Sequence, residues 1–167
     1  MEAVALQKRI RDAIKSGDDS GAITLLTQNP DQLVAVTVFG TWMHVAATHG
    51  RMRVLEHLVR AGADVNARGG ILGGTALNEA ASYGHLPIVQ YLLSVGAKME
   101  TREPQGNPLF SATHGGHADI VRLLLQCGLD PSIRYTGPTM RDMDATAFAR
   151  ERGQTEIVRI LESWGSV

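Results

Sequence analysis

The fold is decided by one stretch, Thr75-Ala76-Leu77-Asn78-Glu79-Ala80-Ala81-Ser82-Tyr83-Gly84-His85-Leu86-Pro87-Ile88-Val89-Gln90-Tyr91-Leu92-Leu93. Apolar residues recur at helical spacing in its first half and again in its second half, as Leu77, Ala80 and Ala81 and then as Ile88, Val89, Leu92 and Leu93. Gly84-His85 interrupts the pattern, so we predict two short helices joined by a tight turn. Two such helices cannot bury both apolar faces against each other, and the unit therefore needs copies of itself on either side.

The copies are present. The first half recurs as Thr41–Gly50 and as Asn107–His117, and glycines between the two predicted helices mark the register at Gly17, Gly50, Gly84, Gly116 and Gly153. Their spacings of 33, 34, 32 and 37 residues predict five repeats, over residues 4–34, 35–68, 69–102, 103–134 and 135–167. A second break follows twelve residues after each of these glycines, at Gly62, Gly96, Gly128 and Gly165, with Asn29 as the expected left-handed substitute in the first repeat.

Two phrases give the repeat a family likeness. The pattern Thr-x-Leu-x-x-Ala-Ala-x-x-Gly-His and the closing phrase Gly62-Ala63-Asp64-Val65-Asn66-Ala67 together resemble the ankyrin repeat over essentially the whole chain. The resemblance implies an all-α solenoid of five stacked helix pairs, with β-hairpin-like fingers projecting between neighbouring pairs. Lys8–Arg11 and Asp144–Ala147 depart from the pattern, as expected of terminal repeats that turn a polar face to water.

Composition excludes several classes of partner. The 167 residues carry a net charge of −1, so net charge does not draw the chain to nucleic acid or to an anionic membrane. No apolar run reaches the roughly 18 residues of a membrane span, and the first residues lack the features of a signal peptide. The single cysteine, Cys127, allows no internal disulfide, and we expect a cytoplasmic protein. The excess of arginine over lysine suggests a bacterial coding sequence.

The histidines do not predict a metal or catalytic site. His44, His85 and His117 match the family's positions, where the resemblance implies hydrogen bonds to the backbone of a neighbouring repeat. His49 and His114 fall on the concave side two repeats apart, roughly 20 Å, which is too far to share a metal ion. The glycine-rich segment 69–74 lacks the lysine and the Ser/Thr of a phosphate loop, and a finger is the better interpretation. We expect no cofactor, no metal and no catalytic residue.

Function should then reside in unusual residues on the concave face and on the fingers. The expected contact set consists of residues that depart from the repeat pattern there: Trp42, His49, Ile71, Leu72, Tyr83, Glu103, His114, Tyr135, Met140 and Arg141. Aromatic and arginine side chains are what the centres of interfaces favour. For Phe39 and Trp42 a second interpretation stays open, in which they fold back and cover the core of the first repeat.

These features predict a non-catalytic protein, monomeric on its own, that binds another protein through its concave face and fingers. The simplest action of such a binder is to cover a partner's working surface, as an inhibitor or a toxin-neutralising immunity protein does. An adaptor that bridges two proteins is the alternative. An enzyme that uses the concave histidines is a remote one.

Overall fold

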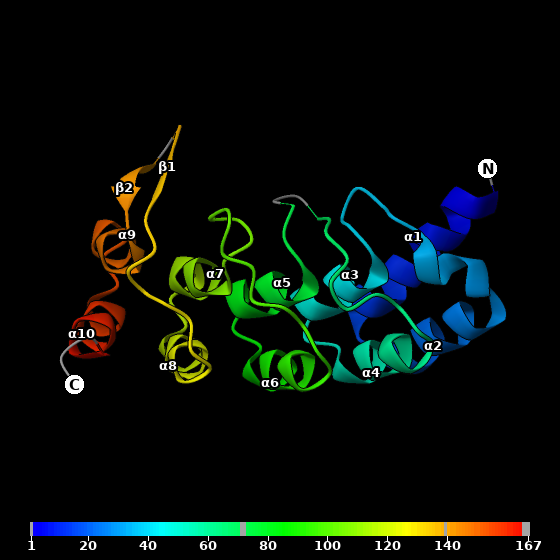
Figure 1. Ribbon diagram of the computed structural model, residues 1–167. Helices are drawn as coiled ribbons and strands as arrows, with labels where there is room; N and C mark the ends of the chain where they lie inside the picture. Colours follow the sequence, from blue (N-terminus) through cyan, green and yellow to red (C-terminus); the bar gives the residue numbers. More distant parts are fainter. Residues whose placement is uncertain (1, 71–72, 139, 165–167) are drawn as a thin grey trace.

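The computed structural model describes residues 2–70, 73–138 and 140–164. Within them ten α-helices stack as five pairs, and a short 3-10 helix and one two-stranded sheet complete the structure (Figure 1). The elements are α1 (Glu2–Ser16), α2 (Asp19–Gln28), η1 (Pro30–Val34), α3 (Trp42–Thr48), α4 (Met52–Arg60), α5 (Ala76–Ser82), α6 (Leu86–Ser94), α7 (Pro108–Gly115), α8 (Ala118–Gln126), β1 (Tyr135–Gly137), β2 (Met140–Met143), α9 (Ala145–Glu151) and α10 (Thr155–Trp164). The predicted all-α solenoid is confirmed.

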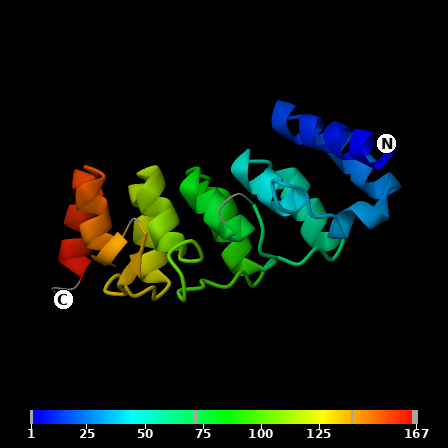
Figure 2. The same cartoon turned by 90° about the horizontal axis from the view of Figure 1, so that it is seen from above.

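The helices form two rows. The first helices of the pairs (α1, α3, α5, α7 and α9) lie in one row, and the second helices lie beneath them (Figure 1). Seen from above, the pairs follow one another from the N-terminus to the C-terminus (Figure 2). The core runs between the rows through all five pairs. Among the described residues, no helix combines the length and the apolar character that crossing a membrane requires.

Glycines at two kinds of break hold the register of the repeats. Those between the helices of a pair all have φ between +69° and +86°, as the sequence predicts: Gly17, Gly50, Gly84, Gly116 and Gly153. Those that follow the second helices have φ between +89° and +93°: Gly62, Gly96 and Gly128. Gly165, the expected counterpart in the last repeat, lies outside the described residues.

Asn29 does not behave as a left-handed counterpart of these glycines at the end of α2, because its φ is −132°. Its side-chain amide donates to the Leu25 carbonyl at 2.8 Å, and its own carbonyl accepts from Gln32 N at 3.0 Å. These bonds lead α2 into η1 without a left-handed residue, so that prediction was wrong.

Three histidines join neighbouring pairs, as predicted. Nε2 of His85 donates to the Thr48 carbonyl at 3.0 Å, and Nε2 of His117 donates to the Ser82 carbonyl at 3.0 Å. In the same way, Nε2 of His44 lies 3.3 Å from the Gly74 carbonyl. Each bond ties a ring to the backbone of an adjacent pair, because the residues that it joins lie 30 to 37 positions apart.

His44 must be neutral to make its contacts. Its Nδ1 accepts from the backbone N–H of Thr41 at 3.2 Å, while Nε2 carries the proton that faces Gly74. Asn78 plays the equivalent part in α5, where its side-chain oxygen accepts from Thr75 N at 2.9 Å. Burial lowers the pKa of His44 from its ordinary value of 6.5, against an opposing contribution from the hydrogen bond to Gly74.

This burial makes stability depend on pH. Below pH 6.5 the unfolded chain takes up a proton at His44 that the folded protein rejects, so the free energy of unfolding falls as the pH falls. The loss has an upper limit of about 1.4 kcal/mol per pH unit for one histidine. Urea unfolding of the wild type and of His44→Asn, measured between about pH 7 and pH 5, should show a smaller slope for the variant, because asparagine keeps the cap without titrating. Equal slopes would contradict this assignment.

The fingers differ in how regular they are. Single bridges pair Thr37 with Gly40 in the first and Gly69 with Gly74 in the second, whereas hydrogen-bonded turns form the third between Glu103 and Asn107. Within the described residues, strands form in the fourth finger alone, as β1 and β2, which pair antiparallel. Hairpin-like geometry is therefore clearest at the C-terminal end of the stack.

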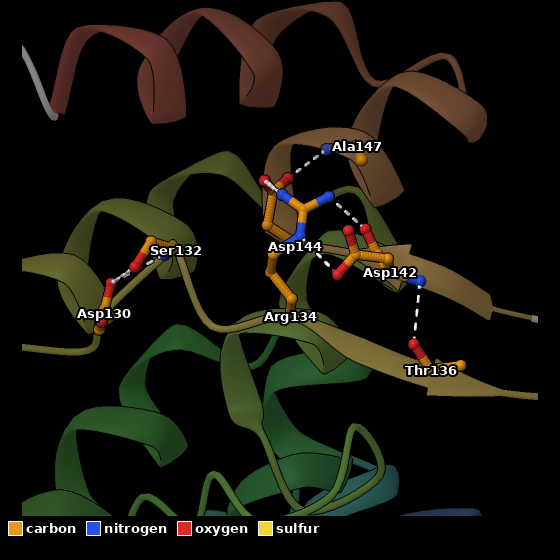
Figure 3. A network of polar contacts seen from close by, with 7 residues as sticks. All are labelled: Asp130, Ser132, Arg134, Thr136, Asp142, Asp144 and Ala147. Atoms are coloured by element: carbon orange, nitrogen blue, oxygen red, sulfur yellow. Dashed lines mark hydrogen bonds and ion pairs between the residues drawn. The ribbon is translucent and has the colours of Figure 1, made fainter.

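A set of polar contacts braces the fourth finger (Figure 3). Nε of Arg134 lies 2.8 Å from Oδ1 of Asp142, and Nη1 lies 2.7 Å from Oδ2 of Asp144. Nη2 also donates to the Asp142 carbonyl. Asp144 in turn caps α9, since its Oδ1 accepts from Ala147 N at 2.8 Å. The finger and the start of α9 are thereby held together through one guanidinium group.

Candidate functional site

Three positions of each first helix share one face. They lie four, seven and eight residues after the residue that caps the helix N-terminus, and we call them the fourth, seventh and eighth positions. The helical period of 3.6 residues brings them to one side of the helix. The caps are Thr41, Thr75, Asn107 and Asp144. From α3 to α9, the fourth positions are Val45, Glu79, Ser111 and Phe148, the seventh are Thr48, Ser82, His114 and Glu151, and the eighth are His49, Tyr83, Gly115 and Arg152.

All of these residues except Gly115 line one groove of about 800 Å³. Arg11 and Lys15 of α1 line it as well. The fingers add Phe39, Gly74, Pro104, Gln105 and Met140 to its wall, and the remaining lining residues are Asn78 and Phe110. The groove therefore draws on all five helix pairs. Most of its lining comes from the first helices, which Figure 1 shows in one row. The volume of the groove lies within the range of small-molecule pockets, but its lining extends over five helix pairs, so it can also take a polypeptide segment.

Charge is distributed unevenly among the lining residues. Arg11 and Lys15 stand on the first pair, and Arg152 stands beside Glu151 on the fifth. Between these ends, the acidic residue among the described lining residues is Glu79, on the third pair. Glu79 is half-buried, and its Oε2 accepts a hydrogen bond from the Thr48 hydroxyl at 3.3 Å. Burial raises the pKa of Glu79 above its usual value, and the bond from Thr48 offsets part of this effect.

The two histidines of the groove favour their neutral forms. The pKa of His49 is lowered by burial and further by the positive charges of Lys15 and Arg51, with a smaller effect from His85. Burial also lowers the pKa of His114, followed by the charge of Arg152. Neutral imidazoles can both donate and accept hydrogen bonds. Among the described residues, no three histidine, cysteine, aspartate or glutamate side chains gather as metal ligands would.

Four residues of the expected contact set line the groove: His49, Tyr83, His114 and Met140. Tyr83 presents the largest apolar surface of the four, with 56% of its side chain exposed. Phe39 also lines the groove and is 41% exposed. Contact of these four residues with a partner stays a prediction.

Two aromatic residues of the expected set belong to the core, and their assignment to the contact surface was wrong. Trp42 is 1% exposed, because it begins α3 with its ring turned inward. Tyr135 is 8% exposed, and its ring packs edge-on against Phe110 with centroids 5.0 Å apart. Its hydroxyl donates to the Thr101 carbonyl at 2.7 Å and accepts from the Asn107 amide at 3.0 Å. Tyr135 therefore anchors the fourth finger to the fourth pair.

The other expected residues that the structure describes lie outside the groove and the core. Glu103 and Arg141 are exposed on the third and fourth fingers but do not line the groove. Glu103 instead forms an ion pair with Arg68 of the second finger, at 3.1 Å. Ile71 and Leu72 lie outside the described residues.

Several groove residues were missed from the sequence, above all Glu79, Ser82, Phe148 and Arg152. The signal was available, since Ser82 stands at the seventh position like His114, and Arg152 at the eighth like His49 and Tyr83. Glu79 and Phe148 stand at the fourth position, one helical turn earlier on the same face. The expected set was chosen by looking for unusual aromatic and arginine side chains. A search of that kind does not find a glutamate or a serine. Counting positions from each N-cap would have found all four.

Comparison with known protein families agrees with the repeat architecture. A family model described as ankyrin repeats (3 copies) matches the chain over residues 11–103 and again over residues 43–135. The two matches overlap and together extend from α1 to the first residue of β1, which is more than half of the chain. None of the curated proteins matches the sequence.

Proposed function

Because this chain belongs to the ankyrin repeat family, we propose that it is a non-catalytic module that binds one partner protein in its groove and inhibits that partner by covering its working surface. Proteins of this family act in protein–protein interaction. The inhibitory action, a toxin-neutralising version of it, the bacterial and cytoplasmic setting and a monomeric free state are all part of the proposal. So is the inference that the first and last helix pairs are terminal repeats of a five-repeat array.

One observation carries the proposal. The seventh and eighth positions of successive first helices, together with finger residues, form a continuous lined groove rather than scattered exposed side chains. Aromatic groups with exposed surface lie along it, at Phe39, Tyr83 and Phe148. A partner that follows the groove across several pairs would bury an area of the size that specific complexes need.

Capture from a lysate of the native organism tests the proposal. The wild type should retain one stoichiometric protein, identified by mass spectrometry, whose own activity falls when this chain is added. Tyr83→Ala should bind that protein roughly 5- to 30-fold more weakly, since truncating a central aromatic contact costs about 1–2 kcal/mol. Thermal unfolding should be nearly unchanged, because the Tyr83 side chain is mostly exposed.

The matched control is Arg60→Ala, at the end of α4 on the second row of helices. This variant should retain the partner as the wild type does. If Arg60→Ala and Tyr83→Ala weaken capture equally, the groove is not the binding surface. If the captured protein keeps its full activity, occlusion is wrong even though binding is real.

One observation favours the adaptor alternative. Three valines of η1 and the first finger, Val34, Val36 and Val38, are 83%, 67% and 82% exposed and do not line the groove. An apolar surface of this kind often marks a site of interaction, and an adaptor needs a second surface. Capture of two proteins, one lost with Tyr83→Ala and the other with Val36→Ser, would favour bridging over inhibition.

A further inference from the structure

The groove contains three exposed or half-buried aromatic side chains, and an arginine of this chain already stacks over the ring of two of them. Cζ of Arg11 lies 5.5 Å from the ring centroid of Phe39, and Cζ of Arg152 lies 5.1 Å from that of Phe148. Tyr83, between them, has no such cation on its ring within the described residues. Among the aromatic groups of the described groove, the central one is thus the one without a cation on its ring.

The carboxylate beside it also has no cation. Within the described residues, Glu79 forms no ion pair, and its contact with the Thr48 hydroxyl uses only Oε2. By contrast, Glu103 pairs with Arg68 and Glu156 with Arg122, although both of these glutamates are mostly exposed. A half-buried carboxylate loses hydration that a surface carboxylate keeps, so a cation placed next to it is worth more.

Glu79 lies in α5 and Tyr83 is the C-cap residue of this helix, four positions and about one turn further on, and both side chains line the groove. We propose that they form a subsite for the guanidinium group of an arginine on the protein that occupies the groove. This inference rests on the proposed function. It names the chemistry of the side chain that the partner inserts at the third helix pair.

Arginine fits this pair of groups better than lysine does. A guanidinium group is planar, stacks on an aromatic face and presents a fork of N–H donors to a carboxylate. Oε1 of Glu79 accepts no hydrogen bond from the part of the chain that the structure describes, and it lies against Gly70 of the second finger, where a Cβ added to the glycine would be 3.0 Å from it. A side chain at residue 70 would crowd this oxygen, so the glycine keeps it accessible.

The ends of the groove add a second constraint on the partner. Lys15 and Arg152 lie two helix pairs from Glu79 on either side, roughly 20 Å away at a spacing of about 10 Å per pair. An extended segment rises about 3.3 Å per residue. The complementary segment therefore carries an arginine with acidic residues about six positions before and after it.

The test uses N-acetylarginine N-methylamide as the probe, with the citrulline analogue as its uncharged match. Two-dimensional NMR of the labelled protein should show that the arginine probe shifts the backbone amides of Glu79 and Tyr83, with at least about fivefold weaker binding of citrulline. Glu79→Gln should weaken the arginine probe by a similar factor and leave the citrulline probe unchanged. The same variant should unfold at or above the wild-type temperature, because the amide oxygen can still accept from Thr48.

Glu156→Gln, on the second row of helices, is the matched control and should bind the arginine probe as the wild type does. Equal binding of the two probes to the wild type, or unchanged binding of arginine to Glu79→Gln, would overturn the inference. Absence of any shift at Glu79 and Tyr83 would overturn it too. These results would leave the proposed function standing, because the capture experiment does not depend on arginine. Conversely, if the NMR titration shows arginine binding but the capture experiment retains no partner, the result counts against the proposed function and not against the arginine subsite.

Discussion

Replacing Leu92 or Leu124 by alanine lowers the free energy of unfolding by about 2–5 kcal/mol. Both side chains are fully buried, each eight residues after the glycine that separates the helices of its pair. They lie in α6 and α8, and the third and fourth pairs each have a neighbouring pair on both sides. The surrounding helices cannot collapse into the space that the lost methyl groups leave, so the cavity cost adds to the transfer cost.

The measurement is urea unfolding followed by circular dichroism. Leu161→Ala is the matched control, since Leu161 occupies the same position in the last pair, where a neighbouring pair covers one side only. We expect it to cost less than either internal variant, because a terminal pair can relax towards solvent. A cost below about 1 kcal/mol at Leu92, or the largest cost at Leu161, would contradict the stacked arrangement of the core.

The second large effect is expected at Gly84. Its φ is +79°, and a Cβ added there would meet Cε1 of His117 at 2.5 Å. Alanine at this position costs about 1–2 kcal/mol for the left-handed backbone. In addition it displaces the imidazole and breaks its bond to the Ser82 carbonyl, which adds about 1 kcal/mol or more.

Gly96→Ala separates these two contributions. Gly96 has φ of +93°, and a Cβ added there would have no atom of the described residues within 4 Å, so alanine at this position bears the backbone cost alone. We therefore expect Gly84→Ala to be more destabilising than Gly96→Ala by about 1–3 kcal/mol in the same unfolding experiment. The difference should shrink when both glycines are replaced in a His117→Ala background. Equal costs in the wild-type background would show that the close approach of His117 to Gly84 contributes nothing to the free energy of unfolding.

The parts of the fold that the sequence predicted are those that depend on local backbone geometry. Gly84 and its counterparts need a positive φ, and His85 and His117 stand at a fixed distance from the turn that they bridge. These requirements on backbone geometry recur in successive repeats, so a single sequence shows the same pattern several times. Asn29 failed as a prediction because η1, which follows it, offered a different way to close α2.

The contact surface was harder to predict, for a reason that Trp42 and Tyr135 illustrate. A large aromatic side chain can fill either an interface or a gap in the core, and composition does not distinguish the two. Trp42 is buried deeply enough that its Nε1 finds no hydrogen-bond partner among the described residues. The burial of each ring depends on the neighbouring pair, and this is tertiary information. Glu79 was missed for the opposite reason, since a charged residue on a helix is ordinarily a solvated one.

The seventh and eighth positions of the first helices, which line the groove, have a consequence for how such a protein can change over generations. None of the side chains at the seventh and eighth positions belongs to the buried core. Mutations there can alter which molecule is recognised while the energy that holds the stack together is left nearly intact. Selection can therefore retarget the protein by small steps at a few codons without passing through unfolded ancestors, and close descendants of one such gene can come to act on different molecules.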